Sequence, residues 1–114
     1  MRRERGWQIM YEKTPESTWN DAIQAKAKAI ADLLIQKQAD YGKGNITVFG
    51  EFGVLVRAYD KISRIQNLMK SEALPRTQES LRDSWADLAG YALIALMLID
   101  KEFDLPLDTI ILNP

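Results

Sequence analysis

Apolar residues recur at intervals of three and four along three long segments of the chain, a spacing typical of amphipathic α-helices. The first predicted helix begins at Thr14 or Ser17, because Thr14 is a suitable N-cap and Pro15 suits the first helical position. It ends near Asp40, because Gly42 follows. Its apolar positions are Trp19, Ile23, Ile30, Leu33 and Leu34.

The second predicted helix runs from Val48 or Glu51 to Met69. Its apolar stripe, which we expect to face the core, consists of Phe52, Leu55, Tyr59, Ile62, Ile65 and Met69. Two polar residues, Glu51 and Gln66, interrupt this sector. A carboxylate at position 51 either is paired or binds a metal, or lies in the first turn, where it suits the helix dipole.

The third predicted helix starts after Thr77 and reaches about Phe103, and the segment Ser71–Thr77 with its Pro75 reads as a loop. Its apolar side consists of Leu81, Trp85, Leu88, Ala92, Ala95, Ile99 and Phe103. The half from Leu88 to Ile99 is apolar all round. Other helices or a second subunit must cover such a helix, so we expect a homo-oligomer.

Two short β-prone segments flank the helices, Trp7–Tyr11 and Asp108–Asn113. They either pair, with each other or with a second subunit, or form tails. The expected fold is therefore all-α, a bundle of three to four helices with short β-prone segments at both termini. The chain forms one domain over residues 1–114, with a core over about 15–103.

Composition narrows the chemistry that 114 residues can perform. The chain has no cysteine and no histidine, which excludes disulfides, thiolate metal sites and a cysteine nucleophile. Its net charge of −1 argues against general nucleic-acid binding, which needs a basic surface. The longest apolar run, Leu88–Ile99, falls short of the roughly 20 residues of a membrane span. No signal-peptide pattern follows the basic start, so we expect a cytoplasmic protein without membrane contact.

Charged residues gather on one face of each of the last two predicted helices. At ~100° per residue, Arg57, Asp60, Arg64 and Asn67 form a stripe opposite the apolar one on the second helix. That stripe is either a solvated face with an Asp60–Arg64 pair or part of a site.

On the third helix, Glu79, Asp83 and Asp87 lie at i, i+4 and i+8 and so line one side. If this side is covered, its acids need basic side chains or a divalent cation. Arg57, Lys61 and Arg64 of the second helix are the candidate basic partners. The arrangement is either a buried salt-bridge network or a ligand site.

The loop Asp40–Asn45 contains two glycines and Lys43. Glycines allow backbone N–H groups to approach a phosphate closely, and the lysine adds positive charge. A simple helix-ending turn explains the same sequence.

Three segments together resemble a known family. They are Lys37–Asn45 with its Asp-Tyr-Gly motif, Phe49–Leu68 with Arg57-x-x-Asp60-Lys61-x-x-Arg64, and Glu79–Tyr91 with Asp83-x-x-x-Asp87-Leu-Ala-Gly-Tyr91. Over roughly Ile30–Ile99 the chain is similar to the nucleotide modification associated domain 1 family, small proteins frequent in phages and prophages. Its helical layout also looks similar to the MazG-like nucleoside triphosphate pyrophosphohydrolases.

The resemblance implies a nucleotide ligand and, for an enzyme, Mg²⁺ held by carboxylates. The MazG-like pattern uses an E-x-x-E helix and an E-x-x-D helix. This chain has Asp60 and Arg64 in place of the first pair, and Asp83 and Asp87 are four residues apart. The candidate metal ligands are Glu79, Asp83, Asp87 and Asp60. The candidate substrate-binding residues are Lys37, Asp40, Tyr41, Asn45, Arg57, Lys61, Arg64 and Tyr91.

Three functions follow as hypotheses. One is an Mg²⁺-dependent nucleotide phosphohydrolase, in which a metal-bound water attacks phosphorus. Another is a protein that captures a nucleotide-derived signal without turnover, as a phage would use against host immunity; arginines suit direct phosphate contact. The third is an oligomerising structural domain with buried ion pairs.

Overall fold

The computed structural model describes residues 18–70 and 75–108. Within them the chain forms four helices and no strand: α2 (Trp19–Tyr41), α3 (Gly44–Thr47), α4 (Gly50–Lys70) and α5 (Pro75–Ile99). The predicted all-α class is therefore confirmed. The first β-prone segment, 7–11, lies outside the described residues. Of the second segment, Asp108–Asn113, all but Asp108 lies outside them as well.

Helix α2 begins one residue after its N-cap, Thr18. The backbone of Thr18 is extended, and its Oγ1 accepts a hydrogen bond from the Asp21 N–H at 3.1 Å. This side chain satisfies one of the free N–H groups of the first turn; the predicted starts, Thr14 and Ser17, lie outside the described residues. The predicted end holds to within one residue, because Gly42 leaves the helix with a φ of 72°.

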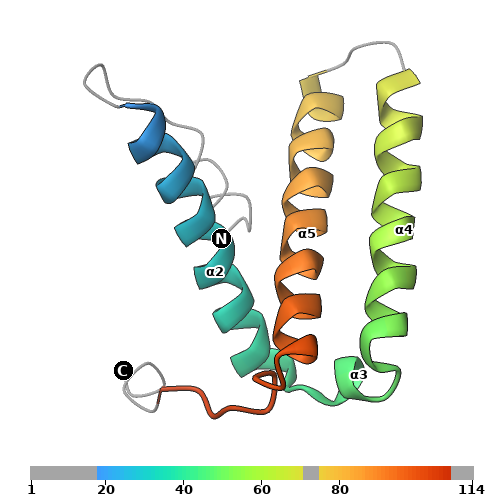
Figure 1. The fold of residues 1–114 in the computed structure, drawn as a ribbon. Helices are drawn as coiled ribbons and strands as arrows, with labels where there is room; N and C mark the ends of the chain where they lie inside the picture. The colour runs from blue at the N-terminus through green and yellow to red at the C-terminus, as the bar shows by residue number, and fades with distance from the viewer. Residues whose placement is uncertain (1–17, 71–74, 109–114) are drawn as a thin grey trace.

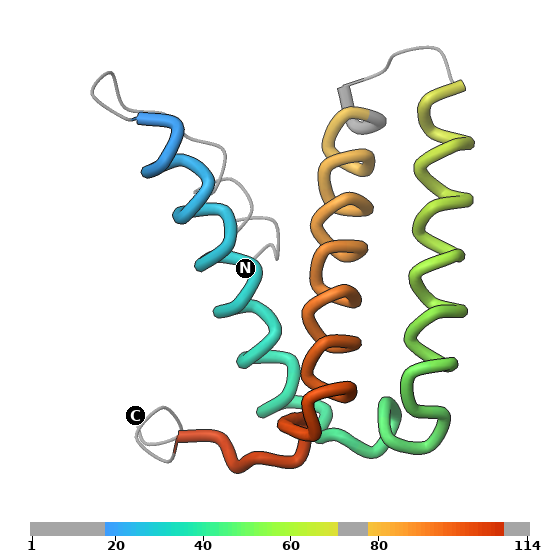
Figure 2. Tube along the Cα trace, in the orientation of Figure 1, coloured from blue at the N-terminus to red at the C-terminus, as the bar shows by residue number. Residues whose placement is uncertain are grey.

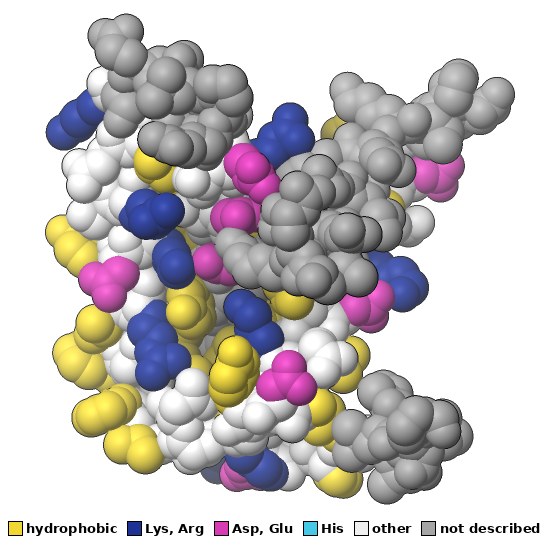
Figure 3. All heavy atoms as spheres, turned by 180° about the vertical axis from the view of Figure 1, so that it is seen from behind, with side chains coloured by type: hydrophobic (Ala, Val, Ile, Leu, Met, Phe, Trp, Pro, Cys, Tyr) yellow, Lys and Arg dark blue, Asp and Glu magenta, His cyan; other side chains and the backbone are white. Residues whose placement is uncertain are grey.

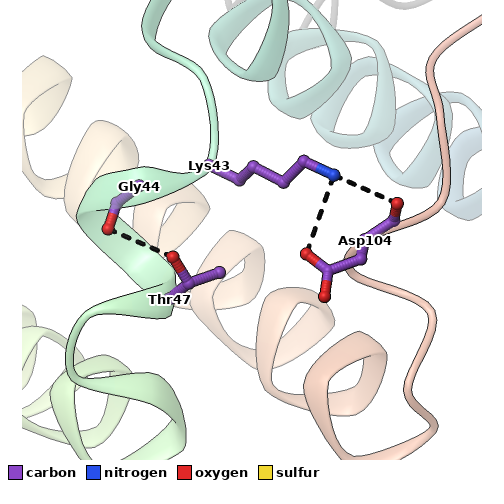
Figure 4. Close-up of polar contacts among 4 residues, drawn as sticks. All are labelled: Lys43, Gly44, Thr47 and Asp104. Carbon is purple, nitrogen blue, oxygen red and sulfur yellow. Dashed lines mark hydrogen bonds and ion pairs between the residues drawn. The ribbon is translucent and has the colours of Figure 1, made fainter.

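The connection from α2 to α4 contains the single-turn helix α3, which the apolar pattern did not predict. In α3 the Thr47 hydroxyl donates to the Gly44 carbonyl at 3.3 Å (Figure 4). The turn buries Ile46. Helix α4 then starts at Gly50, whose φ of 59° favours a residue without a Cβ.

Helix α5 starts earlier and ends earlier than the sequence suggested. Pro75, predicted in a loop, is the first helical residue, a position where its missing N–H has no cost. The helix ends at Ile99, so the prediction that it reaches Phe103 is wrong. The Glu102 N–H bonds to the Met97 carbonyl at 2.8 Å, and the Lys101 N–H bonds to that of Leu98 at 3.2 Å. This is a Schellman ending.

Lys101 occupies the left-handed position of this ending, with a φ of 60°. A side chain at such a position costs free energy that glycine avoids. We therefore expect Lys101→Gly to raise the free energy of unfolding by about 0.5–1 kcal/mol, measured by urea denaturation. Lys101→Ala, which keeps a Cβ, should bring no such gain, and equal stability of the two variants would contradict this account.

The helices are arranged as an open bundle (Figure 1). Helices α4 and α5 run antiparallel and pack along each other, whereas α2 makes far fewer contacts with α5. Figure 2 shows α2 approaching α5 near the end that carries α3 and diverging towards its own N-terminal end. The segment after α5 crosses this closed end of the bundle towards α2. Within the described residues, no helix has the length and apolarity needed to span a membrane.

Besides Ile65 of α4, the buried apolar side chains of the described residues form two small clusters. One joins Ile46 of α3, Val54 of α4 and Phe103 beyond α5; the other centres on Ala86 of α5. Ala29, Ile30 and Leu33 of α2 pack against the second cluster, but none of the residues of α2 is itself buried. The core therefore depends mainly on α3, α4, α5 and the segment after α5.

The predicted core face of the second helix is wrong. Of its six apolar positions only Ile65 is buried, and the other five are exposed. Helix α4 instead faces α5 with Val54, Ile65 and the half-buried Lys61. Long basic side chains can pack their methylene stems against apolar surface, so the contact face falls between the apolar and the charged stripes.

Candidate functional site

A cavity of about 600 Å³ lies between α2, α4, α5 and the segment that follows α5. This volume is within the range of about 300–1,000 Å³ typical of small-molecule sites. Its lining combines an apolar wall with basic, acidic and aromatic side chains.

The apolar wall lies where α2 and α5 meet. Ile30, Leu33 and Leu34 of α2 line it together with Gly90 and Ile94 of α5. A Cβ atom at position 90 would lie 3.3 Å from Leu34 Cδ2, which is tighter than ordinary van der Waals contact. The absence of a side chain at Gly90 therefore allows the two helices to approach closely and close one side of the cavity.

An ion pair joins α4 to α5 at the cavity edge. Lys61 Nζ lies 3.0 Å from Asp87 Oδ2, and the two side chains are 28% and 23% exposed. Both residues line the cavity. The expectation that the acidic side of α5 meets basic side chains of α4 is confirmed at Asp87.

Arg57 of α4 also lines the cavity and is half-buried. Its Nη2 lies 3.4 Å from the Asn45 carbonyl, a long hydrogen bond. A guanidinium carries five N–H donors in a planar fork. Most of this donor capacity is thus available to a ligand in the cavity.

Lys37 and two tyrosines complete the polar lining. Lys37 and Tyr41 come from the last turns of α2, and Tyr91 comes from the middle of α5. Tyr41 is 75% exposed, whereas Tyr91 is half-buried and packs against the Ile46–Val54–Phe103 cluster. Their rings offer flat surfaces on which another ring can stack.

The segment after α5 closes the remaining side. Glu102, Phe103, Leu105 and Leu107 line the cavity. Lys43, in the glycine-containing loop, holds this segment: its Nζ donates to the Asp104 carbonyl at 3.0 Å and lies 3.6 Å from Asp104 Oδ1 (Figure 4). The lysine that the loop pattern suggested for phosphate is therefore engaged with the chain itself.

The structure brings together most of the predicted substrate-binding residues. The six that line the cavity are Lys37, Tyr41, Asn45, Arg57, Lys61 and Tyr91. Asp40 is exposed and accepts a hydrogen bond from Gln36 Nε2 at 3.0 Å. Arg64 donates through Nε to Ser84 Oγ at 3.1 Å, and Ser84 donates to the Ser80 carbonyl. Neither Asp40 nor Arg64 is part of the cavity lining.

The predicted metal ligands are not brought together. Glu79 and Asp60 are exposed, Asp83 has one buried carboxylate oxygen, and Asp87 is paired with Lys61. In the part of the chain that the structure describes, no three acidic side chains converge in a way that could hold a metal ion.

The segment Glu102–Leu107 lines the cavity, although none of its residues was among the predicted site residues. Phe103, Leu105 and Leu107 alternate with polar or proline residues, a pattern that suits an extended segment with one covered side. This alternation was available in the sequence. The place of the segment across the bundle, however, follows from the Schellman turn at Lys101.

Comparison of the chain with models of protein families, with curated proteins and with solved structures found no match.

Proposed function

We propose that this protein binds a nucleotide or a nucleotide-derived small molecule in the cavity between α2, α4 and α5. The observation that carries the proposal is that one cavity is lined by apolar and aromatic side chains as well as by basic ones. A nucleotide combines the matching groups, a flat, weakly polar base and a phosphate.

The basic part suits a phosphate group. Arg57, Lys61 and Lys37 line the cavity, against the carboxylates of Asp87 and Glu102. Because Lys61 is paired with Asp87, Arg57 is the group that we expect to make the strongest phosphate contact. Charge-assisted hydrogen bonds from a guanidinium to phosphate oxygens are frequently bidentate.

The aromatic part suits a nucleobase. Tyr41 and Tyr91 border the cavity beside the apolar wall of Leu33, Leu34 and Ile94. Stacking of a base on an aromatic side chain contributes about 1–3 kcal/mol. Such a contact tolerates any base, so this proposal specifies a nucleotide without specifying its base.

Capture without turnover is favoured over hydrolysis by the positions of the acidic residues. Mg²⁺ prefers oxygen ligands, but of the four predicted ligands only Asp87 lines the cavity, where it is paired with Lys61; Glu102 is the other carboxylate of the lining. Direct recognition by Arg57 requires no metal. We therefore propose sequestration of an intact ligand; use of this activity against a nucleotide-based immune signal is the form that the family resemblance suggests.

A thermal-shift screen tests this proposal. ATP, ADP-ribose, a cyclic dinucleotide, adenosine and inorganic phosphate are each added to the full-length chain. We expect the phosphate-bearing nucleotides to raise the melting temperature, since a ligand at 100 times its Kd stabilises the native state by about 2.7 kcal/mol. Adenosine or phosphate alone should give a smaller shift, because each satisfies only one part of the cavity.

Mass spectrometry of the ligand after incubation separates the competing functions. Recovery of the intact nucleotide, with binding unchanged by EDTA, supports capture. Cleaved products that require Mg²⁺ would instead establish a phosphohydrolase. If none of the nucleotides shifts the melting temperature, the cavity is a structural feature and the proposal fails.

A further inference from the structure

Helix α4 carries a second apolar face that the described residues leave uncovered. Its exposed side chains are Phe52 (70%), Leu55 (62%), Tyr59 (69%), Ile62 (41%) and Met69 (65%). These positions, together with Gln66, are spaced by three, four, three, four and three residues. We refer to these six residues as the α4 seam.

The α4 seam is separate from the contact between α4 and α5. That contact uses Val54 and Ile65, both buried, and the Lys61–Asp87 pair. At ~100° per residue, the seam lies about 110° around the helix from Val54 and on the other side from Arg57. In Figure 3, hydrophobic side chains accordingly gather along the edge formed by α4, beside a group of lysines and arginines.

The spacing of the seam points to a helix as its occupant. Apolar residues that alternate at intervals of three and four produce a narrow stripe along one side of a helix, which a second helix covers by knobs-into-holes packing. An exposed apolar stripe of this length is uncommon on a monomeric protein.

The charges at the two ends of α4 determine the direction of the second helix. Glu51 lies in the first turn and Lys70 in the last. If two α4 helices align antiparallel with their seams facing, Phe52 lies level with Met69 of the second copy, and Tyr59 with Ile62 of that copy. Glu51 then lies level with Lys70 of the second copy at both ends. A parallel alignment would instead place like charges together.

We propose that two copies of this chain associate through their α4 seams as an antiparallel, two-fold symmetric dimer. Such an interface is self-complementary, as a two-fold axis requires. The opposed helix dipoles also favour this direction.

The size of the seam is adequate for a stable interface. A large aromatic side chain buries about 150–250 Å², so the exposed two-thirds of Phe52 and Tyr59 supply about 200–350 Å² per copy. Leu55, Ile62 and Met69 add aliphatic surface. The total reaches the ~500 Å² per partner, or about 1,000 Å² for both, that a specific interface requires.

Light scattering coupled to size-exclusion chromatography tests the dimer. The chain of 13.0 kDa should elute with twice that mass at micromolar concentration. Ile62→Asp buries an unpaired charge at the centre of the seam and should weaken association at least 100-fold, giving a monomer. Asn67→Asp, which adds the same charge to α4 away from the seam, should remain dimeric.

Both substituted side chains are exposed, so we expect both variants to fold. Their helical content, measured by circular dichroism, checks this. A wild-type chain that stays monomeric would overturn the proposal. An oligomer that persists in Ile62→Asp would do so as well, because association would then use another face.

Cross-linking tests the antiparallel direction, and the absence of cysteine from the chain makes it simple. Glu51→Cys and Lys70→Cys are prepared separately, then mixed and treated with a short thiol-reactive linker. The antiparallel dimer predicts a cross-link between the two variants in the mixture and none in either variant alone. A cross-link formed by Glu51→Cys alone would show a parallel dimer and would refute the antiparallel assignment.

Discussion

Phe103→Ala is expected to lower the free energy of unfolding by about 3–5 kcal/mol, the usual effect of removing a buried phenyl ring. Phe103 is 8% exposed and forms one cluster with Ile46 of α3 and Val54 of α4. Because few side chains in the described part of the chain are buried to this degree, the loss of one ring removes a large share of the core. Urea denaturation followed by circular dichroism measures this change.

Leu105→Ala is the matched control for this substitution. Leu105 belongs to the same segment but is 62% exposed, so its truncation should change stability by less than about 0.5 kcal/mol. If Phe103→Ala costs no more than Leu105→Ala, the segment after α5 does not pack against α3 and α4 in solution, and the cavity loses its closing wall.

Arg57→Ala is expected to weaken the binding of ATP about 10- to 150-fold, with little change in stability. A hydrogen bond to a charged group contributes about 1.5–3 kcal/mol, and each 1.4 kcal/mol is a factor of ten in affinity. Arg57 makes one long contact to the Asn45 carbonyl, whose loss should cost the fold little. Isothermal titration calorimetry gives the affinity, and thermal denaturation gives the stability.

Arg64→Ala provides the comparison on the same helix. Arg64 has the same charge but lies outside the cavity lining and bonds to Ser84. We expect ATP to bind this variant as it binds the wild type. Equal losses in the two variants would indicate a general electrostatic attraction to α4 and would contradict a phosphate site at Arg57.

The helices of this protein are largely predictable because their apolar periodicity and end signals agree. Gly42 ends α2 within one residue of the expected position. Pro75 is the exception, because a proline suits a loop as well as the first position of a helix, and here it opens α5. Cap positions are harder to predict, because Thr14, Ser17 and Thr18 are all chemically suitable. Only the backbone shows that Thr18 is extended and bonds to Asp21.

The orientation of α4 could not be predicted from the periodicity alone. A helical wheel shows that one side of α4 is apolar, but it does not show which neighbour covers that side. In the structure, α4 turns Ile65 and Lys61 towards α5 and leaves Leu55 and Tyr59 exposed. If the α4 seam pairs with a second copy, the predicted apolar stripe is a buried face after all, at an interface between subunits.

The candidate site was predictable to the extent that it depends on residues within one helix face. Arg57 and Lys61 lie one turn apart on α4, and both reach the cavity. The row Glu79, Asp83 and Asp87 also shares one side of α5, but its members lie at different depths along the bundle. Their surroundings therefore differ, from solvent at Glu79 to the cavity edge at Asp87. Sequence spacing does not contain this information.

Helix α2 contributes one wall of the cavity yet buries none of its own residues. Its separation from the bundle should therefore require less free energy than global unfolding, and its amides should exchange with solvent sooner than those of α4 and α5. A ligand bound between Lys37 of α2 and Arg57 of α4 would connect α2 to the rest of the bundle. The bound ligand, in addition to the contacts within the chain, would then contribute to the stability of the bundle.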